Sequence, residues 1–245
     1  MNNPSLIPWK SVMRFSSIIP ALALAACGAE APVSQAPNDV RAEVDAPIED
    51  VLPVMGPERV ILGFGDSLMA GYELEENQGY PEKLEAVMRA RGINARVIDA
   101  GVSGDTTQAG AQRLAYVLDN LGEVPDLAIL ELGGNDLLRQ LSPEQTRANL
   151  EAMLQTFAER DIPVVLMGMR APPNLGPEYQ AAFDGLYPAL AEQYGATLVP
   201  FFMEPLAANP DLLLPDRIHP TAEGVDAMVA ATVDTVIGAL PEEGE

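Results

Sequence analysis

An apolar run that ends in a short polar turn constrains this chain more than any other feature of its sequence. Residues 61–68 read Ile-Leu-Gly-Phe-Gly-Asp-Ser-Leu, which is typical of a buried β-strand followed by a tight turn. The turn would bring Ser67 to the surface at the carboxyl end of the strand. Open α/β sheets bind their ligands at that edge, so a reactive hydroxyl is expected where a site would form.

Apolar runs of strand length alternate along the chain with longer segments of helical period. The expected strands are residues 60–64, 96–99, 127–132, 164–169 and 197–199. The expected helices are residues 80–91, 108–121, 142–160, 178–194 and 222–240. Ser142, Pro143 and Gln145 form a helix-start pattern. The alternation predicts an α/β fold of three layers, a five-stranded parallel sheet with helices on both faces.

Three downstream segments supply the groups that Ser67 would need as a nucleophile. They are residues 100–106, 131–136 and 216–219. A serine hydroxyl is weakly nucleophilic until a base accepts its proton, and His219 is the single histidine of the chain. Asp216 lies three residues before it, close enough for one turn to carry both side chains. We expect His219 Nε2 to act as base toward Ser67 and Asp216 to hold Nδ1–H.

Hydrolysis of an acyl group also needs donors aimed at the developing oxyanion. Gly104 lacks Cβ, so its backbone N–H can approach a substrate closely. Asn135 follows two glycines at the end of an expected strand and offers a side-chain amide. The backbone N–H of Ser67 is the third expected donor. A lipase-type G-x-S-x-G turn would require glycine where Met69 stands, so that fold is disfavoured.

The composition narrows the classes of partner. The chain has 36 acidic and 14 basic residues, for a formal net charge of −22. Such a surface argues against nucleic acid and against adhesion to anionic lipid headgroups. One cysteine and one histidine leave no intramolecular disulfide and argue against a structural zinc site. The composition therefore argues against a nucleic-acid partner and against a structural metal.

The first 26 residues resemble an export signal. Lys10 and Arg14 precede an apolar run, residues 15–26, that is too short to span a bilayer. The run ends Leu-Ala-Ala-Cys-Gly (24–28), which resembles a bacterial lipobox, so Cys27 is the expected lipidation site. The expected location is then the periplasmic face of the outer membrane. A soluble periplasmic protein cut after Ala23 or Ala25 is the alternative.

Residues 27–58 are rich in proline and acids and show no helical or strand period. Such a composition does not bury enough apolar surface to offset the entropy of ordering. We predict a flexible tether with a coil-like reach of roughly 30 Å. Residues 59–245 form the expected catalytic domain.

Four sequence blocks are similar to those of the SGNH (GDSL) hydrolases. They are Gly-Asp-Ser-Leu (65–68), Gly104, Gly-Gly-Asn-Asp (133–136) and Asp-x-x-His (216–219). Residues 103–106, 200–204 and 218–220 further resemble the bacterial thioesterase I, lysophospholipase and arylesterase group. The resemblance implies a flavodoxin-like strand order 2-1-3-4-5. It also implies a Ser67, Asp216 and His219 triad, oxyanion donors from Ser67, Gly104 and Asn135, no cofactor, and a monomer.

The implied activity is that of a serine esterase acting on short-to-medium acyl esters, including aryl esters, acyl thioesters and lysophospholipids, through an acyl-serine intermediate. The expected acyl groove is lined by Leu68, Leu137, Leu138, Leu175 and Phe202. Ala171 stands where the thioesterase I group tends to have leucine, which leaves acyl-length preference open. Two alternatives remain, a carbohydrate acetyl esterase with the same triad and an inactive acyl-binding lipoprotein.

Overall fold

The computed structural model describes residues 54–242. The predicted signal, Cys27 and most of the predicted tether lie outside the described residues. The last five residues of the predicted tether, 54–58, have no helix or strand. Two contacts link them to the domain: Asn94 Nδ2 donates to the carbonyl oxygen of Gly56 at 3.1 Å, and Arg96 Nε pairs with Glu58 at 2.8 Å.

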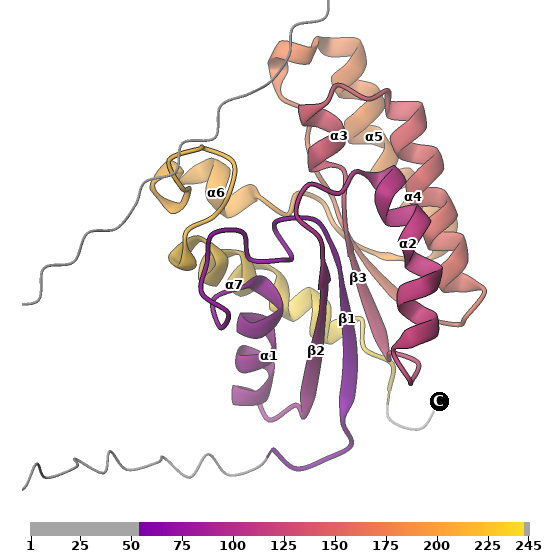
Figure 1. Ribbon diagram of the computed structural model, residues 1–245, viewed down its shortest axis with the longest axis vertical. Helices are drawn as coiled ribbons and strands as arrows, with labels where there is room; N and C mark the ends of the chain where they lie inside the picture. Colours follow the sequence, from indigo (N-terminus) through magenta and orange to yellow (C-terminus); the bar gives the residue numbers. More distant parts are fainter. Residues whose placement is uncertain (1–53, 243–245) are drawn as a thin grey trace, which may run out of the picture. The chain divides into compact units, whose positions relative to one another are not determined.

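Five parallel strands form one sheet in the order β2-β1-β3-β4-β5 (Figure 1). They are β1 (Arg59–Gly65), β2 (Ala95–Gly101), β3 (Leu127–Glu131), β4 (Val164–Met167) and β5 (Thr197–Val199). β1 is apolar and buried along almost its whole length, as expected for a strand covered on both faces. The predicted fold class and strand order are confirmed.

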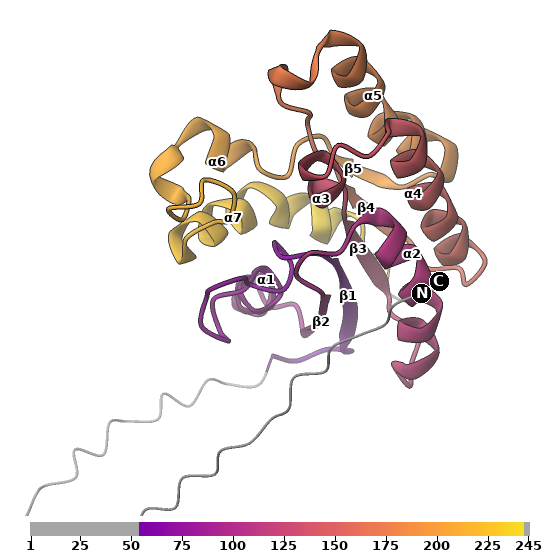
Figure 2. The ribbon, with the colours of Figure 1, turned by 45° about the horizontal axis from the view of Figure 1, so that its top comes forward.

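Helices cover both faces of the sheet (Figures 1 and 2). One layer contains α1 (Tyr80–Ala90) and α7 (Ala222–Gly238), which pack against each other. The other contains α2 (Thr107–Asn120), α4 (Pro143–Ala158) and α5 (Pro177–Tyr194). The predicted start of α4 is present: the Ser142 hydroxyl accepts from Gln145 N at 3.3 Å, and Gln145 Oε1 accepts from Ser142 N at 3.4 Å.

Four short segments escaped the sequence prediction. They are α3 (Gly134–Leu138), α6 (Glu204–Ala208) and two 3₁₀ turns, η1 (Pro173–Leu175) and η2 (Pro210–Leu212). Segments of three to five residues are too short to establish a helical period. Among the described residues, no helix is both long enough and apolar enough to cross a bilayer.

β4 is two residues shorter than predicted. The segment 164–169 leaves the sheet after Met167, where Gly168 bonds both to the last residue of β5 and to the chain that follows it. Gly168 N donates to Val199 O at 2.8 Å, and Phe202 N donates to Gly168 O at 2.8 Å. A Cβ at Gly168 would lie 2.5 Å from the carbonyl oxygen of Pro200, so this close crossing requires glycine. The close approach lies at the carboxyl edge of the sheet, directly after the ends of β4 and β5.

Candidate active site

The carboxyl ends of β1, β2 and β3 lie side by side where the nucleophile turn begins. Gly65, the last residue of β1, is in register with Gly101 of β2 and with Glu131 of β3. A Cβ at Gly65 would lie 2.7 Å from both the carbonyl oxygen and Oε2 of Glu131. Glycine at this point lets β1 approach β3 closely and directs the next two residues into the turn that carries Ser67.

Ser67, His219 and Asp216 form a hydrogen-bonded chain. His219 Nε2 lies 2.9 Å from Ser67 Oγ, and His219 Nδ1 lies 2.5 Å from Asp216 Oδ2. An ionised carboxylate can only accept, so Nδ1 carries a proton and Nε2 of the neutral ring presents its lone pair to the serine. The sequence-predicted triad residues are therefore brought together in the order and spacing that a general base requires.

Asp216 is held ionised by its own turn. Its Oδ1 accepts from the backbone N–H groups of Ile218 at 2.9 Å and His219 at 3.1 Å. Partial burial tends to raise its pKa, but the hydrogen bonds from His219 and the two backbone groups outweigh this and lower the pKa to about 2. Arg217, between the two side chains, has a left-handed backbone with φ of 62°. Asp216 is thus a charged acceptor at any pH near neutrality.

The three expected oxyanion donors lie in the segments that directly follow β1, β2 and β3, with Asn135 in the first turn of α3. Ser67, Gly104 and Asn135 all line one cleft. Gly104 has φ of 88°, a conformation that favours glycine, and its carbonyl oxygen accepts from Arg139 at 2.7 Å. The amide of Asn135 donates one bond to Asp66 Oδ2 at 3.0 Å. An amide nitrogen has two hydrogens, so one remains for a substrate oxygen.

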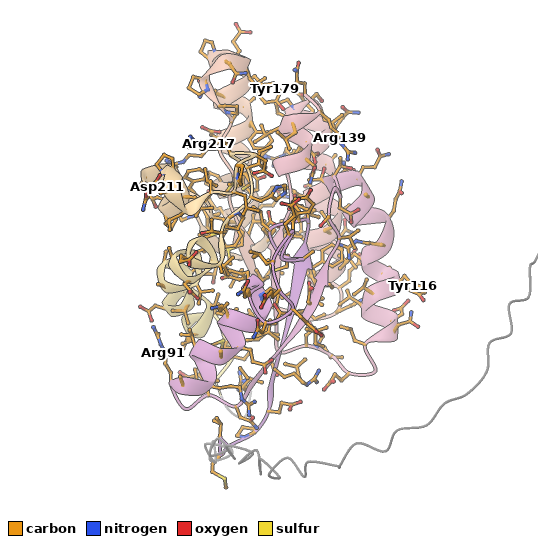
Figure 3. The ribbon with its side chains drawn as sticks, turned by 60° about the vertical axis from the view of Figure 1, so that its left-hand side comes forward. Arg91, Tyr116, Arg139, Tyr179, Asp211 and Arg217 are labelled. Carbon is orange, nitrogen blue, oxygen red and sulfur yellow. The ribbon has the colours of Figure 1, made fainter. Side chains whose placement is uncertain are left out.

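The cleft beside Ser67 is a cavity of about 710 Å³ with mainly apolar walls. Leu68, Leu137, Leu138 and Leu175 line it, as the sequence reasoning expected. Sequence reasoning missed several other lining residues, namely Tyr72, Met169, Arg170, Phe201, Met203, Arg217 and Ile218. Figure 3 shows Arg139 and Arg217 at the same end of the domain, with Arg91 toward the other end.

The prediction that Phe202 lines the groove is wrong. Phe202 is fully buried, and its ring packs edge-on against Tyr80 with centroids 4.9 Å apart. The N–H of Phe202 bonds to Gly168, which turns its side chain into the core and leaves the neighbouring Phe201 to line the cleft. In the tract Pro-Phe-Phe-Met (200–203), the sequence alone does not tell which phenylalanine faces outward.

Two buried carboxyl groups behind Ser67 were also missed. Glu131 is fully buried and Asp66 is only 2% exposed. Asp66 N donates to Glu131 Oε2 at 3.2 Å, and Asp66 Oδ1 accepts from Leu68 N at 3.1 Å. Burial, and then the charge of Asp66, hold the pKa of Glu131 well above its usual range. The sequence signal was present, since one acid precedes Ser67 and the other precedes the Gly-Gly-Asn-Asp block.

A third buried acid joins the helices that carry the site. Asp136 in α3 is fully buried and accepts from the backbone N–H of Thr107 at 2.8 Å. It also accepts from the hydroxyls of Thr107 at 2.5 Å and Thr146 at 3.0 Å. Asp136 thereby fixes α3, which carries Asn135, against α2 and α4. Within residues 54–242, no group of three or more histidine, cysteine or acidic side chains is arranged to hold a metal ion.

This arrangement defines a serine hydrolase on a flavodoxin-like sheet. The family described as the GDSL-like lipase/acylhydrolase family matches residues 64–227, and the chain belongs to it. The esterase AlinE4, described as a member of the SGNH-hydrolase family, shares 60% sequence identity with a TM-score of 0.65. The match covers 76% of this chain and 99% of AlinE4. The predicted resemblance is confirmed.

Two curated relatives extend the comparison. The arylesterase of Vibrio mimicus is 38% identical over 163 residues, which cover 66% of this chain and 80% of the relative. The thioesterase 1/protease 1/lysophospholipase L1 of Escherichia coli strain K12 is 37% identical over 163 residues, which cover 66% of this chain and 76% of the relative. These names support serine ester hydrolysis and favour neither the acetyl esterase nor the inactive binding protein.

Proposed function

We propose that the protein hydrolyses short-to-medium acyl esters through a covalent acyl intermediate on Ser67. The observation that carries the proposal is the hydrogen-bonded chain from Asp216 through His219 to Ser67, with distances of 2.5 and 2.9 Å, at the wall of an apolar cleft. A serine next to an oriented imidazole is an activated nucleophile. An apolar cleft suits an acyl chain or an aryl leaving group.

In the first half-reaction, Ser67 Oγ attacks the carbonyl carbon while His219 Nε2 takes the hydroxyl proton. The negative charge that develops on the carbonyl oxygen is stabilised by the N–H groups of Ser67 and Gly104 and by the Asn135 amide. His219 then donates its proton to the departing alcohol or thiol, and Ser67 remains acylated. In the second half-reaction, water attacks the acyl-serine with His219 again as base, which restores the enzyme.

A relative adds support for the roles of Ser67 and Asp216. Two solved variants of AlinE4 replace a serine and an aspartate by alanine. These two residues are separated along AlinE4 by the same number of positions as Ser67 and Asp216 are here. The correspondence is consistent with a triad in which the nucleophile follows β1 and the acid precedes the histidine in the last loop.

The breadth of substrates follows from the cleft. The names of the relatives include arylesterase, thioesterase and lysophospholipase, and a cavity of about 710 Å³ admits a medium acyl chain with part of its leaving group. We propose that aryl esters, acyl thioesters and lysophospholipids all react at Ser67. The reaction takes place at the carbonyl group that all three share, and the mainly apolar walls of the cleft select little for polar groups elsewhere in the substrate.

The test is hydrolysis of p-nitrophenyl esters from acetate to palmitate by the wild type and by Ser67→Ala in parallel. We expect rates that peak at short-to-medium chains and vanish in the variant. Activity confined to acetate would replace the proposal with an acetyl esterase. Binding of acyl ligands without turnover would replace it with a binding protein. Labelling of Ser67 by a reactive phosphonate, detected by mass spectrometry of the peptide, checks the nucleophile independently of turnover.

We also propose that the protein is exported and anchored by a lipid on Cys27 at the periplasmic face of the outer membrane. The support is the sequence: Lys10 and Arg14, the apolar run and the Leu-Ala-Ala-Cys-Gly motif at 24–28. Growth with radiolabelled palmitate should label the wild type but not Cys27→Ala. An unlabelled periplasmic wild type, cut after Ala23 or Ala25, would contradict the anchor.

We propose a monomer, as the resemblance implies. All three triad residues come from one chain, so the site needs no second copy. Light scattering coupled to gel filtration of the unlipidated domain should give the mass of one chain. A mass of two chains that persists on dilution would contradict the proposal.

A further inference from the structure

Two carboxyl groups lie buried together behind the nucleophile, and the mechanism above uses neither. Glu131 ends β3, and Asp66 is the residue between β1 and Ser67. Both are nearly or fully inaccessible to solvent, and Asp66 N donates to Glu131 Oε2 at 3.2 Å. Two ionised carboxylates at such a site would repel each other without water to screen them. One of the pair must therefore hold a proton.

The hydrogen bonds indicate which one. Asp66 accepts from Leu68 N at 3.1 Å and from the Asn135 amide at 3.0 Å, and the Ser67 hydroxyl lies 3.5 Å away. Glu131 accepts only from Asp66 N, and its Oε1 has no partner among the described residues. A carboxylate surrounded by donors is stabilised as the anion, whereas a carboxyl with few donors is better neutral.

Burial raises the pKa of both carboxyl groups, and the rise is opposed more strongly at Asp66. There the hydrogen bonds from Leu68 and Asn135 reduce the rise without cancelling it. Burial raises the pKa of Glu131 well above its usual range, and the neighbouring Asp66 charge raises it further. The proton therefore belongs to Glu131, which can donate it in a hydrogen bond to Asp66.

We propose that Glu131 and Asp66 are positioning residues of the oxyanion hole: protonated Glu131 donates to Asp66, and the Asp66 anion aims the Asn135 amide into the cleft. The proposal rests on the ester hydrolysis proposed above, because it assigns the pair to the charge that develops on the substrate oxygen. Asp66 binds one hydrogen of the amide at 3.0 Å, which fixes the direction of the other. The same anion accepts from Leu68 N and so holds the turn on which Ser67 lies.

The residues of this hydrogen-bonded network are tightly packed. Glu131 Oε2 lies only 2.7 Å from where a Cβ at position 65 would be, and Asn135 lies in the first turn of α3, which Asp136 fixes to α2 and α4. A donor that is held before the reaction needs no reorganisation as the charge develops. Loss of the pair should therefore slow the chemical step and leave ground-state binding of the ester nearly unchanged.

Steady-state kinetics on a medium-chain p-nitrophenyl ester test this role. Asp66→Ala and Asn135→Ala should each lower kcat by about 10²-fold with KM changed by less than about threefold. Because Asp66 acts through Asn135, the double variant should be little slower than the slower single variant. Independent, multiplying effects in the double variant would overturn the proposal.

Substitutions at Glu131 separate hydrogen bonding from packing. Glu131→Leu fills the space but cannot donate, so kcat should fall about tenfold or more. Glu131→Gln keeps a donor toward Asp66, so kcat should return to within about threefold of the wild type. Equal losses for leucine and glutamine would contradict the donor role. Thr232→Val is the control for a buried polar change away from the cleft, and it should lower thermal stability without changing kcat.

Infrared spectroscopy reads the proton directly and does not depend on activity. A protonated carboxyl has a C=O stretch distinct from that of ionised carboxylates, and the wild type at neutral pH should show one that Glu131→Gln lacks. If the band persists in that variant, Glu131 is not the proton carrier and the proposal fails. If the wild type shows the band but hydrolyses no ester, the proposed function fails while the proton assignment stands.

Discussion

The two halves of the catalytic site are built in opposite ways. The nucleophile half, on the loops after β1, β2 and β3, is buried: Ser67 is 8% exposed and Asp66 is 2% exposed. Its hydrogen bonds join residues that are far apart in the sequence, such as Asn135 and Asp66. The base half is an exposed turn in which Asp216 bonds only to residues two and three positions ahead.

Because the two halves differ in burial, mutations in them should differ in their effects on catalysis and on folding. The buried half is positioned by the core, so changes there should disturb both folding and catalysis. The Asp216 turn is a nearly self-contained unit: Leu214 N donates to His219 O at 2.7 Å and closes it, and the helix cap at Thr221 follows directly. Changes in the turn should therefore remove activity while the fold persists.

The largest effect is expected at the point where the halves meet. Ser67→Ala should lower kcat by about 10⁴-fold or more, because it removes the hydroxyl that donates to His219 Nε2 and attacks the substrate. Unfolding midpoints should hardly change, since the hydroxyl adds little to the core. Ser142→Ala is the matched control: loss of the α4 cap should lower the free energy of unfolding by about 1 kcal/mol and leave kcat unchanged. A Ser67→Ala protein with wild-type turnover would disprove the mechanism.

A change in the base half should be nearly as severe for activity and mild for stability. Asp216→Asn keeps the size of the side chain but favours the wrong tautomer of His219, so kcat should fall by about 10³–10⁴-fold. The free energy of unfolding should change by less than about 1 kcal/mol because the turn is exposed. Kinetics and denaturant unfolding of the same preparation measure the change in kcat and the change in the free energy of unfolding, with the exposed Asp211→Asn as the control. A cooperative loss of structure in Asp216→Asn would show that the turn is not self-contained.

A change in the buried half should be severe for stability. Asp136→Ala removes the acceptor of three hydrogen bonds in a fully buried site and leaves their donors unpaired. We expect a loss of about 3 kcal/mol in the free energy of unfolding. Asp119→Ala, which removes only an exposed ion pair with Arg160, should cost less than about 0.5 kcal/mol. Equal losses for the two variants would contradict the contrast between the halves.

The same contrast explains which parts of the molecule were predictable from sequence. The strands and long helices follow from apolar period and length, and the helix start at Ser142 follows from local capping chemistry. Asp216 and His219 are three residues apart, so the sequence already places them together. Local bonds of this kind leave a local signature.

The buried network left a weaker signature because its partners are distant in sequence. Asp66 and Glu131 are 65 positions apart, and only the register of β1 against β3 brings them together. Phe202 failed as a groove residue for the same reason, since a backbone bond to Gly168 decides which of two adjacent phenylalanines faces the core. Tertiary pairings of this kind are not visible in a period or a motif.

The smallest expected effect is on the pH dependence of the free energy of unfolding. The contributions of the two halves should change in opposite directions as the pH rises. The folded-state pKa of Asp216 is about 2 against an ordinary value of 3.8, so its ionised form stabilises the fold above about pH 4, and this contribution is lost as the pH falls toward 2. The pKa of Glu131 is raised, so its neutral form stabilises the fold below its ordinary value of 4.5, and this contribution is lost as the pH rises through the raised value.

Urea unfolding between pH 2 and 8 measures both contributions as differences from Asp216→Asn and from Glu131→Gln. The stability of the wild type relative to Asp216→Asn should fall toward low pH, by a small amount because the side chain is 37% exposed. The stability of the wild type relative to Glu131→Gln should fall in the other direction, toward high pH. Two differences that fall in the same direction would mean that Glu131 holds no proton in the folded protein, and the contrast between a protonated buried carboxyl and an ionised exposed one would be lost.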